Sequence, residues 1–199
     1  GEDFGILAGD GLLNLAYETM FNAIKNISSD YADIENAKKM ALYSQAAAVI
    51  ASKAGVDGMV GGQSLDVYLT DKPMDKEQLD YIFRVKKGAL IEAAFMAGGI
   101  LAGCDEKTQG LLCKAGYNVG FAFQIKDDIL DVTSTQEVLG KPVLSDERNN
   151  KTTYVTLYGL EKAEKDTYDM SKEAMGIIKS IGHNEYLEEL INMLIHRNK

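Results

Sequence analysis

The stretch FQIKDDILDV, residues 123–132, is the clearest candidate for chemistry, because three aspartates lie inside an otherwise apolar run. Two carboxylates about 5 Å apart repel each other by on the order of 3 kcal/mol at an effective dielectric constant of about 20. Asp127, Asp128 and Asp131 therefore need something that offsets their mutual repulsion. A bound cation is the simplest candidate.

On a helix, at about 100° per residue, the apolar and polar residues of the segment 121–132 fall on opposite sides. The apolar side, within about 80°, consists of Phe121, Ile125, Ile129 and Val132. The polar side combines Gln124 with the three aspartates. A solvated acidic face is the alternative, although such a face more often carries lysine at i+4. We favour a site for Mg²⁺, which prefers oxygen ligands and usually takes one or two carboxylates together with substrate phosphate oxygens.

Lysines before and after this helix are suited to bind the phosphate groups of a substrate that binds together with Mg²⁺. Lys86 and Lys87 belong to a preceding predicted helix that can lie antiparallel to the aspartate helix, and Lys141 follows Gly140 in the loop after it. Each lysine alone is more often a surface residue. Because lysine is a compact positive charge suited to phosphate, the lysines and aspartates together predict a diphosphate held by Mg²⁺ and lysine.

The helical period dominates the rest of the chain. Helices are predicted over residues 4–26, 31–54, 58–69, 75–101 and 105–132, with two or three more after the polar loop 139–150. Asp75 and Asp105 are the expected N-caps, and Gly9 and Gly11 indicate that the first helix packs closely against a neighbour. Since no alternating strand pattern occurs, the expected fold class is all-α, with one domain over residues 1–199.

Composition narrows the function further. The chain has 199 residues, is 46% hydrophobic and carries a net charge of −9, which argues against nucleic acid as a partner. Its cysteines, Cys104 and Cys113, form no framework of disulfides or metal ligands, so a reduced cytoplasmic protein is expected. The most apolar window contains Glu92 and is shorter than the roughly 20 residues of a membrane span.

At these residues the chain resembles a known family. GFAFQIKDDILDV followed by LGK resembles the second aspartate-rich motif of the trans-isoprenyl diphosphate synthases of the bacterial farnesyl diphosphate synthase type. Further blocks similar to that family occur in the family's order: ILAGDGLL, GGQSLDV, KKGALIEAA, SDERNNKTTY and HRNK. The resemblance implies an isoprenoid synthase-type bundle of long helices around a central apolar cavity, and a homodimer. It also implies a short-chain prenyltransferase, in which Mg²⁺-assisted ionisation of an allylic diphosphate precedes attack by isopentenyl diphosphate.

The same resemblance assigns roles to individual residues. Asp127, Asp128 and Asp131 match the metal-binding motif, with Asp127 the foremost ligand. Lys86 and Lys141 match lysines that bind the allylic diphosphate, and the backbone carbonyls of Lys86 and the next residue are implied to face the allylic cation.

Other matches concern the walls of the site. Gln124 matches a glutamine that lines it. Gln63 and Asp66 match the family's Gly-Gln-x-x-Asp helix, where a structural role and a substrate-binding role are both open. Lys87 stands where the family usually has threonine, which removes a hydroxyl contact and leaves the backbone carbonyl in place.

The family also carries a first aspartate-rich motif and an Arg-Arg-Gly segment before the block that matches ILAGD. We therefore expect this chain to correspond to the C-terminal two-thirds of a synthase, without the N-terminal helices, and to be inactive as a 199-residue fragment. Two alternatives stay open: a class I terpene cyclase, and a non-catalytic partner that regulates a prenyl synthase.

Overall fold

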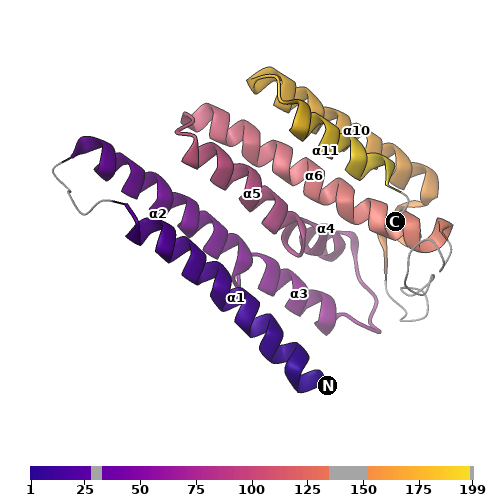
Figure 1. Cartoon of the computed structure of the whole chain (residues 1–199). Coiled ribbons are helices and arrows are strands. Elements are labelled where there is room, and N and C mark those ends of the chain that lie inside the picture. The colour runs from indigo at the N-terminus through magenta and orange to yellow at the C-terminus, as the bar shows by residue number, and fades with distance from the viewer. Residues whose placement is uncertain (28–32, 135–151, 198–199) are drawn as a thin grey trace.

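The computed structural model of the chain describes residues 1–27, 33–134 and 152–197, and within these ranges the regular structure is helical (Figure 1). The helices are α1 Glu2–Lys25, α2 Ile34–Ala54, α3 Met59–Tyr68, α4 Lys76–Val85, α5 Gly88–Leu101, α6 Glu106–Thr133, α9 Tyr154–Tyr158, α10 Leu160–Ile181 and α11 Glu185–His196. The predicted all-α class is confirmed. None of the described helices has the length and hydropathy that crossing a lipid bilayer requires.

Helix α6 lies in the middle of the bundle and packs against α5 on one side and α10 on the other (Figure 1). Helix α2 covers the far side of α5, and α11 packs against α10 and α6. Lys87, just before α5, bonds Asp127 near the end of α6. The helices α5 and α6 therefore run antiparallel, an arrangement that the sequence analysis considered for the lysine-bearing segment.

Aspartates begin the helices that carry the site, as expected. The Asp75 carboxylate accepts a hydrogen bond from the Gln78 N–H at 2.8 Å, and the Gln78 side chain accepts one from the Asp75 N–H at 3.0 Å. This reciprocal pair satisfies backbone donors that the first turn of α4 leaves free. The Asp105 carboxylate likewise accepts from the Thr108 N–H at 2.8 Å at the start of α6.

The prediction of one continuous helix over 75–101 is wrong. The structure has two helices, α4 and α5, with Lys86 and Lys87 between them. The Lys86 N–H donates to the Ile82 carbonyl at 2.8 Å and closes α4, and α5 begins at Gly88. The apolar period continues across this break, so periodicity did not reveal it. The consequence is that two adjacent lysines reach different acids.

A buried cluster of aromatic side chains packs beside the site. It contains Phe83, Phe121 and Tyr154, with ring centroids 5.6 to 6.1 Å apart. On the predicted apolar side of α6, Ile125 and Ile129 are buried, with exposed fractions of 0% and 4%. Val132 is the exception, exposed at 41% in the last turn of α6.

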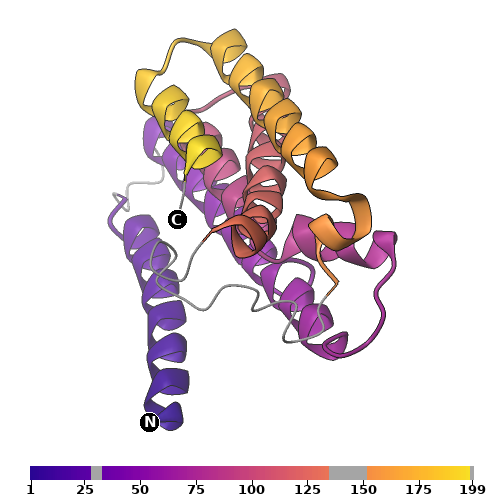
Figure 2. The same cartoon turned by 90° about the vertical axis from the view of Figure 1, so that its right-hand side faces the viewer.

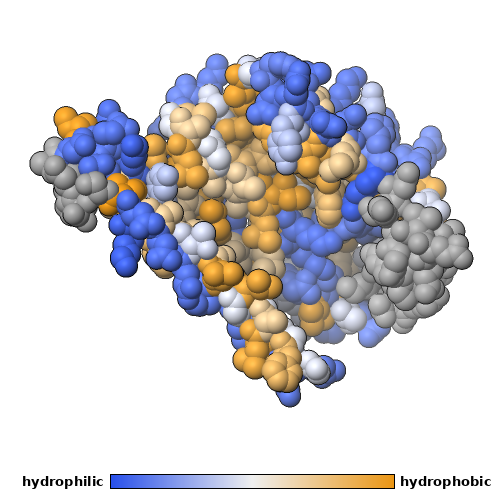
Figure 3. Space-filling view, in the orientation of Figure 1, coloured by the Kyte–Doolittle hydropathy of each residue, from blue (hydrophilic) through white to orange (hydrophobic). Residues whose placement is uncertain are grey.

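Helix α1 differs from the expectation of close packing. None of its residues is buried, and its contacts are mainly with α2, so it stands away from the rest of the bundle (Figure 2). Phe4 and Phe21 are 77% and 64% exposed, and apolar side chains cover much of the helix surface (Figure 3). A Cβ added to Gly9 or Gly11 would meet no heavy atom within 4 Å. Among the described residues, these glycines therefore make no close helix contact.

Close packing occurs instead between α5 and α6. A Cβ built on Gly120 would lie 2.6 Å from the Gly88 Cα, which is too short for any real side chain. Glycine at position 120 lets the two backbones approach each other beside the site.

We predict that Gly120→Ala destabilises the protein by about 1–3 kcal/mol, because the added methyl group forces the two helices apart. Gly110→Ala is the matched control on the same helix, since a Cβ there meets nothing within 4 Å. It should be neutral or stabilising by up to about 1 kcal/mol. The measurements use the protein encoded by the open reading frame that contains this chain, hereafter the encoded protein. Urea denaturation measures the free energy of unfolding of both variants. Equal shifts for the two variants would contradict the prediction.

Candidate functional site

A polar cavity of about 220 Å³ lies beside the C-terminal half of α6. Its walls come from α3, α4, α6 and the residues just before α5 and α9, and its apolar part is formed by Leu79, Ile82 and Phe83. The polar residues that line it include six predicted site residues: Asp66, Lys86, Lys87, Gln124, Asp127 and Asp128. Residues from distant parts of the sequence are thus brought together around the aspartates.

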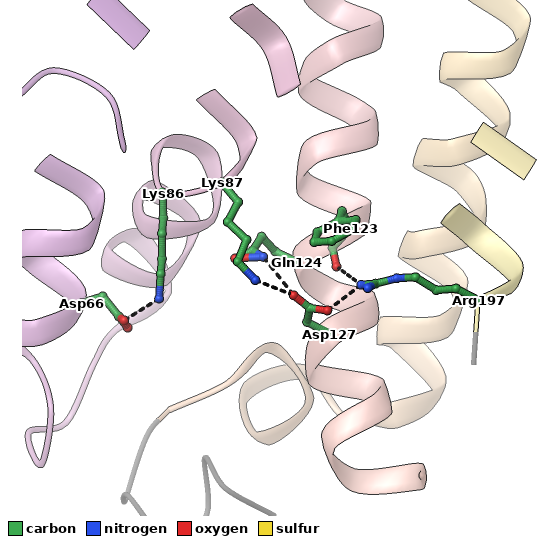
Figure 4. A network of polar contacts seen from close by, with 7 residues as sticks. All are labelled: Asp66, Lys86, Lys87, Phe123, Gln124, Asp127 and Arg197. Atoms are coloured by element: carbon green, nitrogen blue, oxygen red, sulfur yellow. Dashed lines mark hydrogen bonds and ion pairs between the residues drawn. The ribbon is translucent and has the colours of Figure 1, made fainter. Parts of the chain in front are cut away.

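Asp127 is the centre of a polar network (Figure 4). Its Oδ2 accepts from the Lys87 Nζ at 2.8 Å and from the Gln124 Nε2 at 3.4 Å. Its Oδ1 accepts from the Arg197 Nη2 at 2.6 Å. Both oxygens are therefore occupied by donors, which come from α6 itself, from the residues just before α5 and from the residue just after α11. Since the Asp127 side chain is 24% exposed and Asp131 is 3% exposed, the interpretation as a solvated acidic face is wrong.

The environment of Asp127 favours its ionised form. Burial alone would raise the pKa of this carboxyl, but the hydrogen bonds and positive charges of Lys87 and Arg197 outweigh burial and lower the pKa below its usual value. Asp127 is thus an anion at neutral pH and can bind a cation.

Arg197 was not predicted as a site residue. Its guanidinium donates to the Phe123 carbonyl at 3.0 Å and stacks on the Phe123 ring, with 3.9 Å from Cζ to the ring centroid. The sequence offered only the basic ending HRNK as a signal. Pairing with Asp127 could not be read from it, because the two residues are far apart in the chain.

Lys86 points away from Asp127 toward α3. Its Nζ lies 2.6 Å from the Asp66 Oδ2, and both side chains are largely buried, at 23% and 11% exposure. Asp66 thus holds the lysine that was predicted to bind phosphate. Gln63, on the same helix, is exposed and is not among the residues that line the cavity.

The other two aspartates have different surroundings. The Asp128 Oδ2 accepts a hydrogen bond from the Tyr154 N–H at 2.6 Å and so fixes the start of α9 on α6. Asp131 is 3% exposed and does not line the cavity. The three aspartates therefore do not face one common point.

The positions of the aspartates fit Mg²⁺ only if a second ligand supplies further oxygen atoms. Within the described ranges, no three acidic, histidine or cysteine side chains form a group that could hold a metal ion by themselves. Mg²⁺ commonly takes one or two protein carboxylates and completes its shell with water and phosphate oxygens. Asp127 and Asp128 both line the cavity, so the donors fit an ion that is bound jointly with a phosphate ligand.

Other features lie outside this cavity. Lys141 and the predicted loop 139–150 fall outside the described residues. A larger, mainly apolar pocket of about 470 Å³ is lined by Phe95, Gly98, Leu112, Leu187 and other residues. Leu112 precedes Asp127 by about four turns of α6, or about 22 Å, so this pocket is distant from the aspartates.

Comparison with known proteins agrees with this geometry. The sequence pattern of the polyprenyl synthetase family matches residues 1–194. A farnesyl diphosphate synthase of Escherichia coli (strain K12) is 36% identical over 205 residues, covering 100% of this chain and 65% of that protein. A geranylgeranyl diphosphate synthase of Cyanophora paradoxa is 38% identical over 175 residues, covering 87% of this chain and 55% of that protein.

Solved structures show the same fold. A geranyltransferase from Helicobacter pylori, complexed with magnesium and isoprenyl diphosphate, has a TM-score of 0.75 at 29% identity, covering 96% of this chain and 58% of that one. With the match over nearly its whole length, the chain belongs to the polyprenyl synthetase family. It spans 55% to 65% of the length of the two curated relatives named above.

We predict that Asp128→Ala destabilises the encoded protein by about 1.5–3 kcal/mol, because the Tyr154 N–H loses a charged acceptor. Asp128→Asn keeps an oxygen acceptor and should cost less than half as much. Asp169→Ala, at an exposed acid on α10, should stay within about 0.5 kcal/mol. Thermal unfolding compares the three variants. If Asp128→Ala matched Asp169→Ala, Asp128 would have no anchoring role.

Proposed function

We propose that this chain is part of a short-chain prenyltransferase that condenses isopentenyl diphosphate with an allylic diphosphate. The observation that carries the proposal is the cavity in which the carboxylates of Asp127 and Asp128 lie beside Lys86 and Lys87. Such a set of charges suits a diphosphate and a divalent cation together. Relatives named farnesyl and geranylgeranyl diphosphate synthases support it.

In the proposed reaction, the C–O bond of the allylic diphosphate breaks, and pyrophosphate leaves with the electron pair. The isopentenyl double bond then forms the new C–C bond, and a proton is lost. Mg²⁺, when bound, supplies positive charge for the departing pyrophosphate. Lys86 and Lys87 add positive charge at the same place, which lowers the barrier because charge develops there in the transition state. Lys141 is proposed to bind the allylic diphosphate as well.

The other residues have supporting roles in this proposal. Asp127 and Asp128 orient the divalent ion, and Asp131 contributes to the acidic helix end without facing the cavity. Gln124 and the apolar wall of Leu79 and Phe83 limit the access of water, which would otherwise quench an allylic cation. Asp66 positions Lys86 through their 2.6 Å contact.

Homodimerisation in the cytoplasm is part of the same proposal. Helix α1 exposes Phe4, Leu12 and Phe21 along one element, and apolar surface of this extent favours burial against another chain. The free Cys104 and Cys113 suit a reducing compartment. Sedimentation that found only monomers of the encoded protein at micromolar concentration would contradict the dimer.

A non-catalytic regulatory partner is the second candidate. The specific observation in its favour is Lys87, which stands where the family usually has threonine and bonds Asp127. Turnover of isopentenyl diphosphate with an allylic diphosphate by the encoded protein distinguishes the two. A terpene cyclase would instead release a cyclic hydrocarbon or alcohol without consuming isopentenyl diphosphate.

We predict that Mg²⁺ strengthens pyrophosphate binding to the encoded protein and that Asp127→Asn removes most of this gain. The physical reason is that the Asp127 carboxylate would hold the ion, whose positive charge would then favour the binding of phosphate. Prenyl transfer by the variant should fall by about 10²–10³-fold. Calorimetry with pyrophosphate, with and without Mg²⁺, measures the binding gain, and Asp169→Asn is the matched control. Equal gains in the wild type and in Asp127→Asn would exclude Asp127 as a ligand.

We predict that Lys141→Ala weakens binding of the allylic diphosphate by about tenfold, the loss expected for one charge-assisted contact. The residue follows Gly140 in a segment that the sequence predicts as a polar loop, so the melting temperature should change little. Lys107→Ala, at an exposed position in the first turn of α6, serves as the control. A sharp fall in the melting temperature with normal kinetics would show that Lys141 has a structural role instead.

A further inference from the structure

The Asp127 carboxylate carries a cation on each of its oxygens. The Lys87 Nζ lies 2.8 Å from Oδ2 and the Arg197 Nη2 lies 2.6 Å from Oδ1. A divalent ion that binds the same oxygens must therefore compete with both side chains. The three side chains together carry a net charge of +1, which repels a free Mg²⁺ and attracts a diphosphate.

The two cations differ in how firmly they are held. The Lys87 side chain is 50% exposed, whereas that of Arg197 is 16% exposed and lies on the Phe123 ring. Lysine has a flexible stem, so Lys87 can move to a neighbouring anion at little cost. Lys87 also lines the polar cavity, which places such an anion within its reach.

Arg197 has unused hydrogen-bonding capacity. Its Nε is buried, and among the described residues it has no hydrogen-bond partner. Because this atom is buried and Arg197 is not among the residues that line the polar cavity, a ligand in that cavity leaves the arginine in place on the Phe123 ring. Lys87 is therefore the cation that can exchange Asp127 for a bound anion.

We propose that Lys87 and Arg197 occupy Asp127 in the absence of ligand and that Lys87 moves to the diphosphate when it binds, which releases one oxygen of the carboxylate to the divalent ion. The metal then binds Asp127 only together with the diphosphate. Lys87 is thus a positioning residue that orders the two binding steps. The inference rests on the proposed function, because it takes Asp127 as a metal ligand and a diphosphate as the anion.

The test measures binding of Mn²⁺ alone to the encoded protein, by the electron paramagnetic resonance signal of the free ion. Lys87→Thr should strengthen Mn²⁺ binding by about fivefold, the factor that the loss of one partly exposed ion pair represents. Lys87→Arg keeps a cation on Asp127 and should bind Mn²⁺ like the wild type. Arg197→Gln should act in the same direction as Lys87→Thr.

Two comparisons tie the effect to Asp127. In an Asp127→Asn background, Lys87→Thr should leave Mn²⁺ binding unchanged, because the released carboxylate is missing. Lys114→Thr removes the same charge from an exposed pair with Glu173 about 20 Å along α6, and it should also have no effect. Pyrophosphate binding without metal should become weaker in Lys87→Thr, since the lysine no longer reaches the phosphate.

Unchanged Mn²⁺ binding in Lys87→Thr would overturn the proposal, as would an equal gain in the Asp127→Asn background. Failure of the proposed function gives a different result. In that case pyrophosphate would bind equally with and without Mg²⁺ in the wild-type protein, whatever the Lys87 variants do with Mn²⁺ alone.

Discussion

The close approach of α5 and α6 at Gly88 and Gly120 is the constraint on which the site depends. Gly88 directly follows Lys87, and Gly120 precedes Asp127 by about two turns of α6. The separation of the two backbones at these glycines therefore sets whether the Lys87 ammonium reaches the Asp127 carboxylate at 2.8 Å. Because packed helices transmit small displacements along their length, a methyl group at this contact would move the charges of the site as well as reduce stability.

The break between α4 and α5 explains how the acidic residues tolerate one another. Without it, Lys86 and Lys87 would continue one helix and point in directions set by its period. With it, Lys86 pairs with Asp66 on α3 and Lys87 pairs with Asp127 on α6. Asp128 is satisfied by the Tyr154 N–H. The repulsion among nearby carboxylates is thus offset by separate partners.

Part of this arrangement could be predicted from the sequence. The caps at Asp75 and Asp105 and the buried and polar sides of α6 follow from local rules that act over a few residues. The break at Lys86 could not be predicted, because the apolar pattern runs through it without interruption.

Two other features required information that local rules do not contain. The contact of Arg197 with Asp127 joins two helices through tertiary packing, which no spacing in the sequence encodes. Helix α1 was predicted to pack closely against a neighbour, but the helix itself does not specify which element that neighbour is. The roles of the predicted site residues in catalysis stay predictions, whereas membership of the polyprenyl synthetase family is shown.

The hydrogen bond between Asp128 and the Tyr154 N–H also shapes the cavity. Thr152 and Thr153, which line the cavity, directly precede Tyr154 in the chain. By fixing the Tyr154 backbone, Asp128 therefore holds one wall of the cavity in place as well as the start of α9. A carboxylate can thus set the shape of a binding site through the backbone that it holds, in addition to any contact that it makes with a ligand.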